Sequence, residues 1–200
     1  QASRPVLPPD VLVDLDRPEA VLIVPDADSR AQVRMLVNSL RGYRAAVGPS
    51  VPPGAAGNSM RWARRALDLA RRGVLASEEL VWCQRHLAVL TLFQDEALLE
   101  SFVECRLRPL RRLRESQRGV LGGTMLAWLQ HGMNATAVAT ALHVHVQTVR
   151  RRLRQLDQLF GEQIEDPVLR FELQLALWAD RVRRGGQPGH GPDTGHYTGD

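Results

Sequence analysis

Short apolar runs and helical repeats alternate over the first 83 residues of the chain. Residues 11–16 and 20–26 are branched apolar runs separated by a polar break at 17–19, and they predict a pair of strands. The elements that the same patterns predict next are a helix behind a cap at Asp28 or Ser29, a strand over 44–47, a helix over 57–72 and a strand over 80–83. Together they indicate a small α+β unit of about 80 residues.

Downstream of this unit the apolar positions follow a helical period almost without interruption. Amphipathic segments at 87–93, 95–107 and 110–117 are predicted to connect the two halves of the chain, and a further helix is predicted over 120–131. The last segment, 185–200, is rich in glycine and has very few large apolar side chains. It cannot bury enough surface to fold, so we expect a disordered tail there.

Residues 134–160 have the pattern of a helix-turn-helix. Asn134 is a suitable N-cap for a short helix over 135–142, and Thr136 can support it. The small side chain of Ala139 within that helix would let a following helix approach closely. The first half of the motif is therefore predicted to form a short, capped helix that packs against a second one.

The second helix is predicted to follow a tight turn at 143–145, in which the apolar Val144 would be pinned into the core. Over 146–160, at about 100° per residue, one face is an apolar seam made of Val149, Leu153, Leu156 and Phe160. The opposite face carries Gln147, Arg151, Arg154 and Gln158, flanked by Thr148 and Arg150. Because no acid precedes Asp157, this face has the chemistry of a helix that reads the DNA major groove.

The charge distribution points in the same direction. All 26 basic residues are arginine, and the segment from Arg106 to Arg154 holds ten of them with one acid, Glu115. This block carries +9, so the rest of the chain sums to −5. Such a block favours a polyanionic partner, although charge alone leaves nucleic acid, an anionic membrane and an acidic protein open. An arginine-rich helix face is most often only solvated, but the capped helix and turn that precede this one favour DNA.

A family resemblance rests on two runs, TMLAWLQHGMNATAVATALHVHVQTVRRRLRQLDQLFG and EDPVLRFELQLAL. Over about residues 110–177 the chain resembles the C-terminal DNA-binding domain of PucR/CdaR-type bacterial transcriptional regulators, and TVRRRL is also similar to Fis-type helix-turn-helix proteins. The second run is similar to the family's closing helix, which would start at Asp166-Pro167. The resemblance implies a sequence-specific DNA-binding regulator of transcription.

The N-terminal part is similar, more loosely, to the GGDEF-like domain that precedes this module in the family. AAVGPS at 45–50 and the helix around Arg64-Arg65-Ala66-Leu67 carry this similarity. The Gly-Gly-Asp-Glu-Phe motif of diguanylate cyclases is absent, which implies a structural or sensory domain without cyclase activity. The expected fold is α+β, with a small degenerate GGDEF-like α/β domain at 1–83, connecting helices at 84–117, an all-α helix-turn-helix domain at 118–184 and the tail at 185–200.

Individual roles follow from these positions. We expect contacts to base edges from Gln147, Thr148 and Arg151, with Val146 able to touch a thymine methyl group. Contacts to phosphates are expected from Arg150, Arg154, His145, Thr136 and the helix end at Asn134. Structural roles are expected of Ala139, Val144, Val149, Leu153 and Arg152, the last as an ion-pair partner of an acid in the C-terminal helix. His145 is equally suited to stabilise the turn, and because the family usually has Arg-Asn where this chain has Val146-Gln147, the target sequence is not expected to follow a family consensus.

Other chemistry is weakly supported. His143 and His145 could bind a metal, but no nearby acid or cysteine completes a site. A metal role for His190 and His196 of the tail is not favoured either, so no metal, cofactor or enzymatic activity is expected. Cys83 and Cys105 lack metal-binding spacing and are expected to be buried or half-buried thiols of a cytoplasmic protein.

The expected partners follow from the size of the module. One helix-turn-helix reads few base pairs, so a homodimer or higher oligomer on paired half-sites is expected, formed through the α+β unit and the connecting helices. RNA polymerase is a further candidate partner, and no membrane association is expected. The alternative function is a basic helical interaction module that binds an acidic protein rather than DNA.

Overall fold

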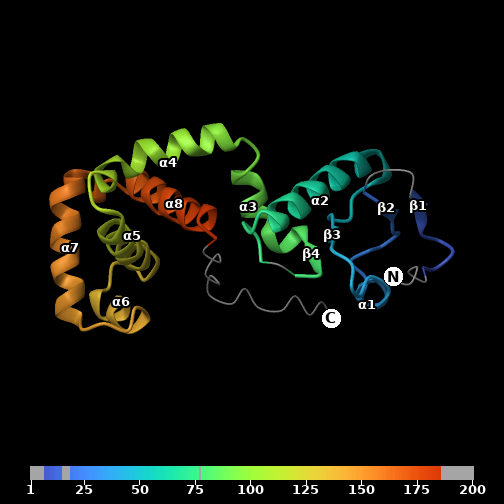
Figure 1. The fold of residues 1–200 in the computed structure, drawn as a ribbon, viewed down its shortest axis with the longest axis horizontal. Helices are drawn as coiled ribbons and strands as arrows, with labels where there is room; N and C mark the ends of the chain where they lie inside the picture. The colour runs from blue at the N-terminus through green and yellow to red at the C-terminus, as the bar shows by residue number, and fades with distance from the viewer. Residues whose placement is uncertain (1–6, 15–18, 77, 186–200) are drawn as a thin grey trace. The chain divides into compact units, whose positions relative to one another are not determined.

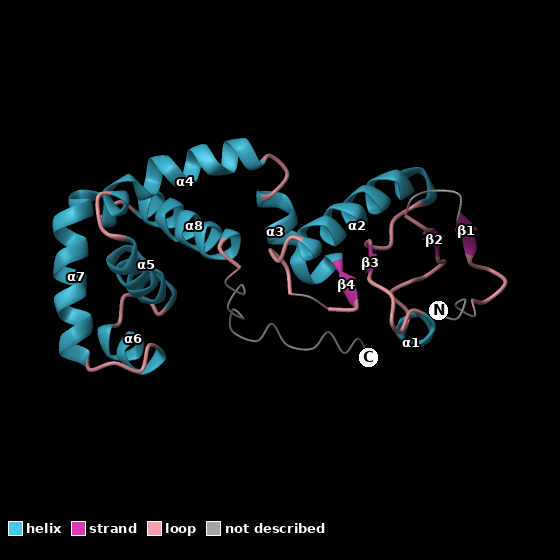
Figure 2. Cartoon of the chain, viewed as in Figure 1, coloured by secondary structure: helices cyan, strands magenta, loops and turns pink. Residues whose placement is uncertain are grey.

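The computed structural model of the chain describes residues 7–14, 19–76 and 78–185. Its contacts divide the chain between Gln94 and Asp95 into an N-terminal and a C-terminal unit, each of which is described by itself. Helices make up most of the described residues, and two small sheets lie in the N-terminal unit (Figure 2). This content agrees with the α+β class expected from the sequence.

The strands described in the N-terminal unit are three residues long and pair in two separate sheets. β1 (Leu12–Asp14) and β2 (Val21–Ile23) are antiparallel, which confirms the pair predicted around residues 17–19. β3 (Ala45–Val47) and β4 (Leu80–Trp82) are parallel, and their pairing joins segments far apart in the sequence. Each of these strands falls inside the apolar run that predicted it and is shorter than that run.

The helices of the N-terminal unit are α1 (Arg30–Ser39), the 3₁₀ turn η1 (Pro53–Ala55), α2 (Ala56–Arg71), the 3₁₀ turn η2 (Cys83–His86) and α3 (Leu87–Leu92) (Figure 1). Of the two caps that the sequence offered for α1, Ser29 is the one used: its hydroxyl oxygen accepts a hydrogen bond from the backbone N–H of Gln32 at 3.3 Å. This bond satisfies a donor that the first helical turn leaves unpaired.

α2 packs on β3 and β4 and supplies the centre of this unit's core. Ala66 and Leu69 of α2 and Val81 of β4 are almost completely buried there. Gly48 directly follows β3, and a Cβ atom at that position would collide with Ser59 of α2. Only glycine therefore allows the chain to pass this close to the helix.

The C-terminal unit consists of helices throughout its described residues: α4 (Glu96–Arg111), α5 (Glu115–Gln130), α6 (Ala135–Ala141), α7 (Val146–Phe160), the 3₁₀ turn η3 (Gly161–Ile164) and α8 (Pro167–Arg183) (Figure 1). α4 and α8 lie side by side and run in opposite directions. Two ion pairs join them: Arg106 with Glu172 at 2.6 Å, and Glu100 with Arg183 at 3.1 Å. α8 begins at the predicted Asp-Pro step, where the Asp166 carboxylate accepts from the backbone N–H of Val168 at 2.7 Å.

The prediction of a separate helix over residues 110–117 is wrong. α4 continues through Pro109 to Arg111, and α5 is already helical from Glu115. Pro109 lies in the last turn of α4, so its missing N–H removes a single helical hydrogen bond, and the neighbouring Leu110 is fully buried. α5 runs through three glycines because its apolar residues pack on α7 and α8, and packing of this kind overrides weak helix propensity; these glycines are Gly119, Gly122 and Gly123.

Three further expectations concern the cysteines, the tail and membranes. Cys83 and Cys105 are free; Cys83 is buried, but Cys105 is exposed on the outer face of α4, which corrects the expectation of a half-buried thiol. Burial raises the pKa of Cys83 to about 11, so its thiol stays protonated at neutral pH. The tail beyond Gly185, with its two histidines, lies outside the described residues. Within the described ranges, every helix is too short or too polar to cross a membrane.

Candidate nucleic-acid interface

α6 begins at a side-chain cap. The Asn134 Oδ1 atom accepts hydrogen bonds from the backbone N–H groups of Thr136 and Ala137, at 2.9 and 3.1 Å. These two bonds satisfy donors that would otherwise be unpaired at the start of the helix. The N-cap predicted at Asn134 is confirmed, and both Asn134 and Thr136 are exposed to solvent.

The turn between α6 and α7 is closed by two backbone hydrogen bonds. The N–H of His143 donates to the Thr140 carbonyl at 3.2 Å, and the N–H of Val144 donates to the Ala139 carbonyl at 3.0 Å. This pair of bonds is the Schellman arrangement, which requires a left-handed residue after the helix. His143 takes that conformation, with φ of 52°, although a Cβ atom makes it unfavourable.

His145 is the N-cap of α7. Its ring Nδ1 atom accepts a hydrogen bond from the backbone N–H of Gln147 at 3.2 Å. A neutral imidazole that accepts at Nδ1 carries its proton on Nε2, so the same ring can cap the helix and donate to a ligand. Of the two roles considered for His145, stabilising the turn is therefore present in the structure, and the phosphate contact stays a prediction.

The apolar side of α7 rests on a small core shared by three helices. Ala127 of α5, Val138 and Ala139 of α6, and Val149 of α7 form this buried cluster. Val144 of the turn packs against it, as expected for a pinned turn. The partly buried side chains that complete the cluster are Trp128, Ala135, Leu142, Val146 and Leu153. Leu156 and Phe160 extend the buried side toward the end of α7, so the predicted seam is confirmed.

The opposite side of α7 is exposed. Gln147, Arg150, Arg151 and Arg154 all lie in solvent, as helical periodicity predicted. Thr148 is half-buried at the margin of this face, and Val146 is half-buried against the core cluster. The predicted DNA-contacting residues of α7 thus share one face of the helix, with Thr148 and Val146 at its edge rather than at its centre.

Arg152 lies between the two sides and is held by α5. Its Nη1 atom donates to the Oγ1 atom of Thr124 at 3.2 Å, and Thr124 in turn donates to the Val120 carbonyl at 2.8 Å. The sequence suggested an acid in the C-terminal helix as the partner, whereas the observed partner is a fully buried hydroxyl on α5. The signal that was missed is a lone threonine among the apolar residues of that helix.

Some arginines of the basic block between residues 106 and 154 bond to neighbouring residues, and the others have no partner among the described residues. Arg106 pairs with Glu172, Arg111 pairs with Glu104 at 3.0 Å, and Arg118 donates to the Leu113 carbonyl at 3.4 Å. The arginines of the block without a hydrogen bond or ion pair to any described residue are Arg108, Arg112, Arg114, Arg150, Arg151 and Arg154. All six are exposed, so the charge that is available to a partner is concentrated at the α4–α5 junction and on α7.

Metal-binding clusters do not occur in the described ranges, where no three His, Cys, Asp or Glu side chains are grouped around one point. His143 and His145 have no such companions. In the N-terminal unit, burial lowers the pKa of His86, and its Nε2 atom is buried without a hydrogen-bond partner. Neither this histidine nor the buried Cys83 belongs to the surface on α7.

Comparison with known proteins agrees with this geometry. Residues 121–179 match the family model of the PucR C-terminal helix-turn-helix domain, a stretch that contains α6, the turn and α7. The chain is also 27% identical over 164 residues to the carbohydrate diacid regulator of Escherichia coli (strain K12). That match covers 78% of this chain but 42% of the relative, so the chain spans less than half of the relative's length. No solved structure matches the chain.

The match to the family model begins at residue 121, after the N-terminal unit, so the GGDEF-like character expected for residues 1–83 stays a prediction. The expected resemblance is supported for the C-terminal unit by the match to the domain model, and the match to part of a regulator agrees with it. Over residues 121–179, the chain is thus similar to the C-terminal helix-turn-helix domain of PucR.

Proposed function

We propose that the C-terminal unit binds double-stranded DNA with α7 in the major groove, as the sequence-specific part of a transcriptional regulator. The observation that carries this proposal is the division of α7 into a buried apolar seam and an exposed face of amides and guanidinium groups. That face contains no acid before Asp157. The similarity to the PucR domain and to a regulator supports the proposal independently.

In this arrangement the exposed residues divide by their chemistry. Gln147 has the amide geometry that pairs with adenine, and Arg151 can donate two hydrogen bonds to guanine. Thr148 and Val146 would touch bases only at the margin, because both are half-buried. Contacts to phosphates, which position the protein without reading sequence, are assigned to Arg150, Arg154, His145, Asn134 and Thr136.

The test is selection of bound sequences from a random DNA pool, followed by titration of the selected site at several salt concentrations. We expect an enriched motif and an affinity that falls steeply with salt, because binding releases counterions from the phosphates. A protein that bound no DNA at low salt, or bound without salt dependence, would refute the proposal.

The rival function is a basic module that binds an acidic protein. The six unpaired arginines would suit such a partner as well, because a basic surface attracts any polyanion. The same selection distinguishes the two functions: equal, weak binding to every sequence in the pool, together with saturable binding to one acidic protein, would favour the rival.

We further propose that the protein acts as a homodimer on paired half-sites, because one module of this size covers few base pairs. Light scattering of the free protein and of the complex would test the homodimer, and strictly monomeric protein in both would rule it out.

A degenerate GGDEF-like domain for the N-terminal unit is also part of the proposal. The stretch aligned with the carbohydrate diacid regulator is longer than the C-terminal unit, so the similarity reaches into this part.

A further inference from the structure

The two sides of α7 border hollows of different character. On one side, a hollow of about 630 Å³ separates α7 from the start of α5. Ser116 and Gln117 of α5 face Arg151, Arg152 and Gln155 of α7 across it, and no acid lines it. Leu113, Val120, Leu121 and Leu159 complete the lining, so positive charge and hydrogen-bond donors lie here beside apolar side chains.

On the other side of α7, the hollow is smaller, about 260 Å³, and its lining is mainly apolar. Met125 and Trp128 form part of its wall, and its charged members are Arg154 and Asp157. Arg154 is the one guanidinium in this lining and shares it with the carboxylate of Asp157, so this side offers less net positive charge than the other. Of the two sides, this one is the less suited to a polyanion.

We propose that one sugar-phosphate strand of the DNA lies in the hollow between α5 and α7, so that the DNA-binding surface extends from α7 to the α4–α5 junction. The inference rests on the proposed function and adds the side of α7 on which the strand lies. A helix in the major groove is bordered by phosphates on both sides, and the protein's contacts to them fix its orientation on the duplex.

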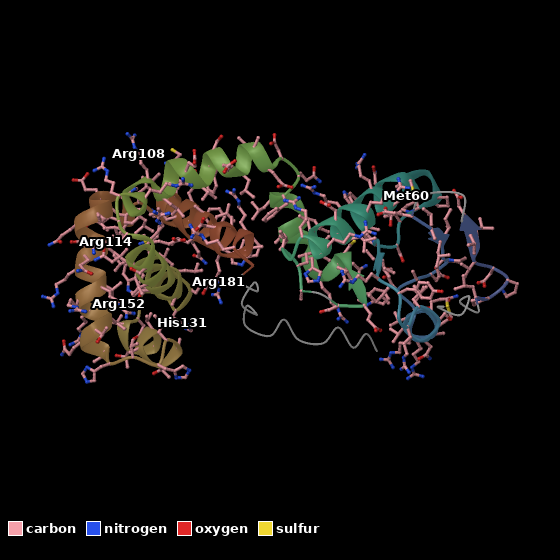
Figure 3. The ribbon with its side chains drawn as sticks, in the orientation of Figure 1. Met60, Arg108, Arg114, His131, Arg152 and Arg181 are labelled. Atoms are coloured by element: carbon pink, nitrogen blue, oxygen red, sulfur yellow. The ribbon has the colours of Figure 1, made fainter. Side chains whose placement is uncertain are left out.

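The donors around this hollow fit a phosphate strand. Arg152 uses Nη1 to bind Thr124, and since a guanidinium has five N–H groups, others remain for a ligand in the hollow that this residue lines. Ser116 and Gln117 are exposed and add neutral donors. Arg114, exposed and unpaired among the described residues, lies at the start of α5 on the side of α7 (Figure 3).

The one acid of the basic block does not oppose this arrangement. Glu115 is next to Ser116 in the sequence, but it does not line the hollow. Its carboxylate lies 3.8 Å from the guanidinium of Arg184, at the end of α8. The start of α5 therefore presents Ser116 and Gln117 to the hollow, while Arg114 lies next to the lining residue Leu113 in the sequence and the acid is directed elsewhere.

The experiment places one negative charge in the hollow. Ser116→Glu adds an acid to the first turn of α5, where the helix dipole favours acids, so the fold should not be weakened. Leu98→Glu is the matched control, because it adds the same acid to the first turn of α4 at an exposed position outside the hollow. Arg114→Ala is paired in the same way with Arg181→Ala, which removes an exposed arginine of α8 from the opposite side of the unit (Figure 3).

We expect Ser116→Glu to weaken binding to the selected site about tenfold at moderate salt, and Arg114→Ala to lower the slope of log affinity against log salt by about one. Both should leave the preferred sequence unchanged, and both controls should bind like the unaltered protein. Equal losses in Ser116→Glu and Leu98→Glu, or an unchanged slope in Arg114→Ala, would overturn the inference while the unaltered protein still bound its site. Failure of the unaltered protein to bind DNA would instead overturn the proposed function.

Discussion

α7 and α8 are neighbouring arginine-bearing helices of one unit, yet they present opposite surfaces. α7 has a single acid, and three of its four arginines are unpaired within the described chain. α8 contains Glu172 and Asp180 beside three arginines, of which Arg183 is paired with Glu100 of α4. The two helices therefore differ in net charge, and an acid of a neighbouring helix pairs with Arg183 but with none of the α7 arginines among the described residues.

The apolar residues differ in the same way. Phe160 of α7 is 3% exposed, whereas Val168 and Phe171 of α8 are 66% and 64% exposed. α7 thus buries its apolar side and exposes its charge, while the start of α8 leaves apolar side chains in solvent. A helix that must place polar groups against a partner needs this separation, because the buried seam fixes which side chains point outward.

The largest effect should come from this difference in burial. Phe160→Ala removes a buried ring from the C-terminal end of α7 and should lower the free energy of unfolding by about 3–5 kcal/mol. Phe171→Ala, which removes the same ring from a mostly exposed site, should change it by less than about 0.5 kcal/mol. Urea unfolding followed by circular dichroism measures both. Similar losses in the two variants would mean that Phe171 is covered in solution.

The next effect concerns the arginines themselves. Arg151→Ala should weaken binding to the selected DNA site by about 1–3 kcal/mol and relax the preference at one base position. Arg183→Ala removes the same charge from α8, where it is paired with Glu100, and should leave DNA affinity nearly unchanged. Fluorescence anisotropy on the selected site and on a single-base variant provides the comparison. An equal loss in the two variants would show that only net charge matters.

A smaller and less specific effect is expected at Arg154. Because it is assigned to a phosphate, Arg154→Ala should weaken binding to all sequences alike and lower the salt slope by about one. The measurement is the same titration over a range of salt concentrations, with cognate and random DNA. If Arg154→Ala weakened only cognate binding, the residue would contact a base.

The smallest effect concerns how each helix begins. α8 begins at an Asp-Pro cap, whereas α7 follows a turn in which His143 occupies a left-handed conformation. His143→Gly should stabilise the unit by about 0.5 kcal/mol, since relief of the strain exceeds the entropy that glycine loses on folding. Thermal unfolding would measure this change. A lower melting temperature would instead show that the imidazole makes a stabilising contact.

How much the sequence could predict depended on how local the determining interactions are. α7 has the predicted bounds because its cap, its seam and its polar face all lie within one stretch of sequence. The Asn134 cap and the Asp166 cap were found for the same reason. The structure of the segment around Pro109 could not be predicted in this way, because it depends on the burial of Leu110 and on the packing of the glycine-rich α5.

The site followed the same rule. The exposed face of α7 could be predicted from helical angle, but the partner of Arg152 and the hollow beside α5 could not. Both depend on residues that are distant in the sequence and meet only after α5 and α7 have packed. Ser116 and Gln117 carry no local signal that would have singled them out, since polar residues at the start of a helix are common.

The hydrogen bond between Arg152 and Thr124 has a consequence for the angular setting of α7. Side-chain ends lie about 5–6 Å from a helix axis, so a rotation of roughly 10° moves each of them by about 1 Å. Such a displacement is enough to misalign paired hydrogen bonds with a base edge. Together with the buried seam, this bond between a guanidinium and a buried hydroxyl restrains the azimuth of α7, and with it the direction in which the polar groups of the helix point.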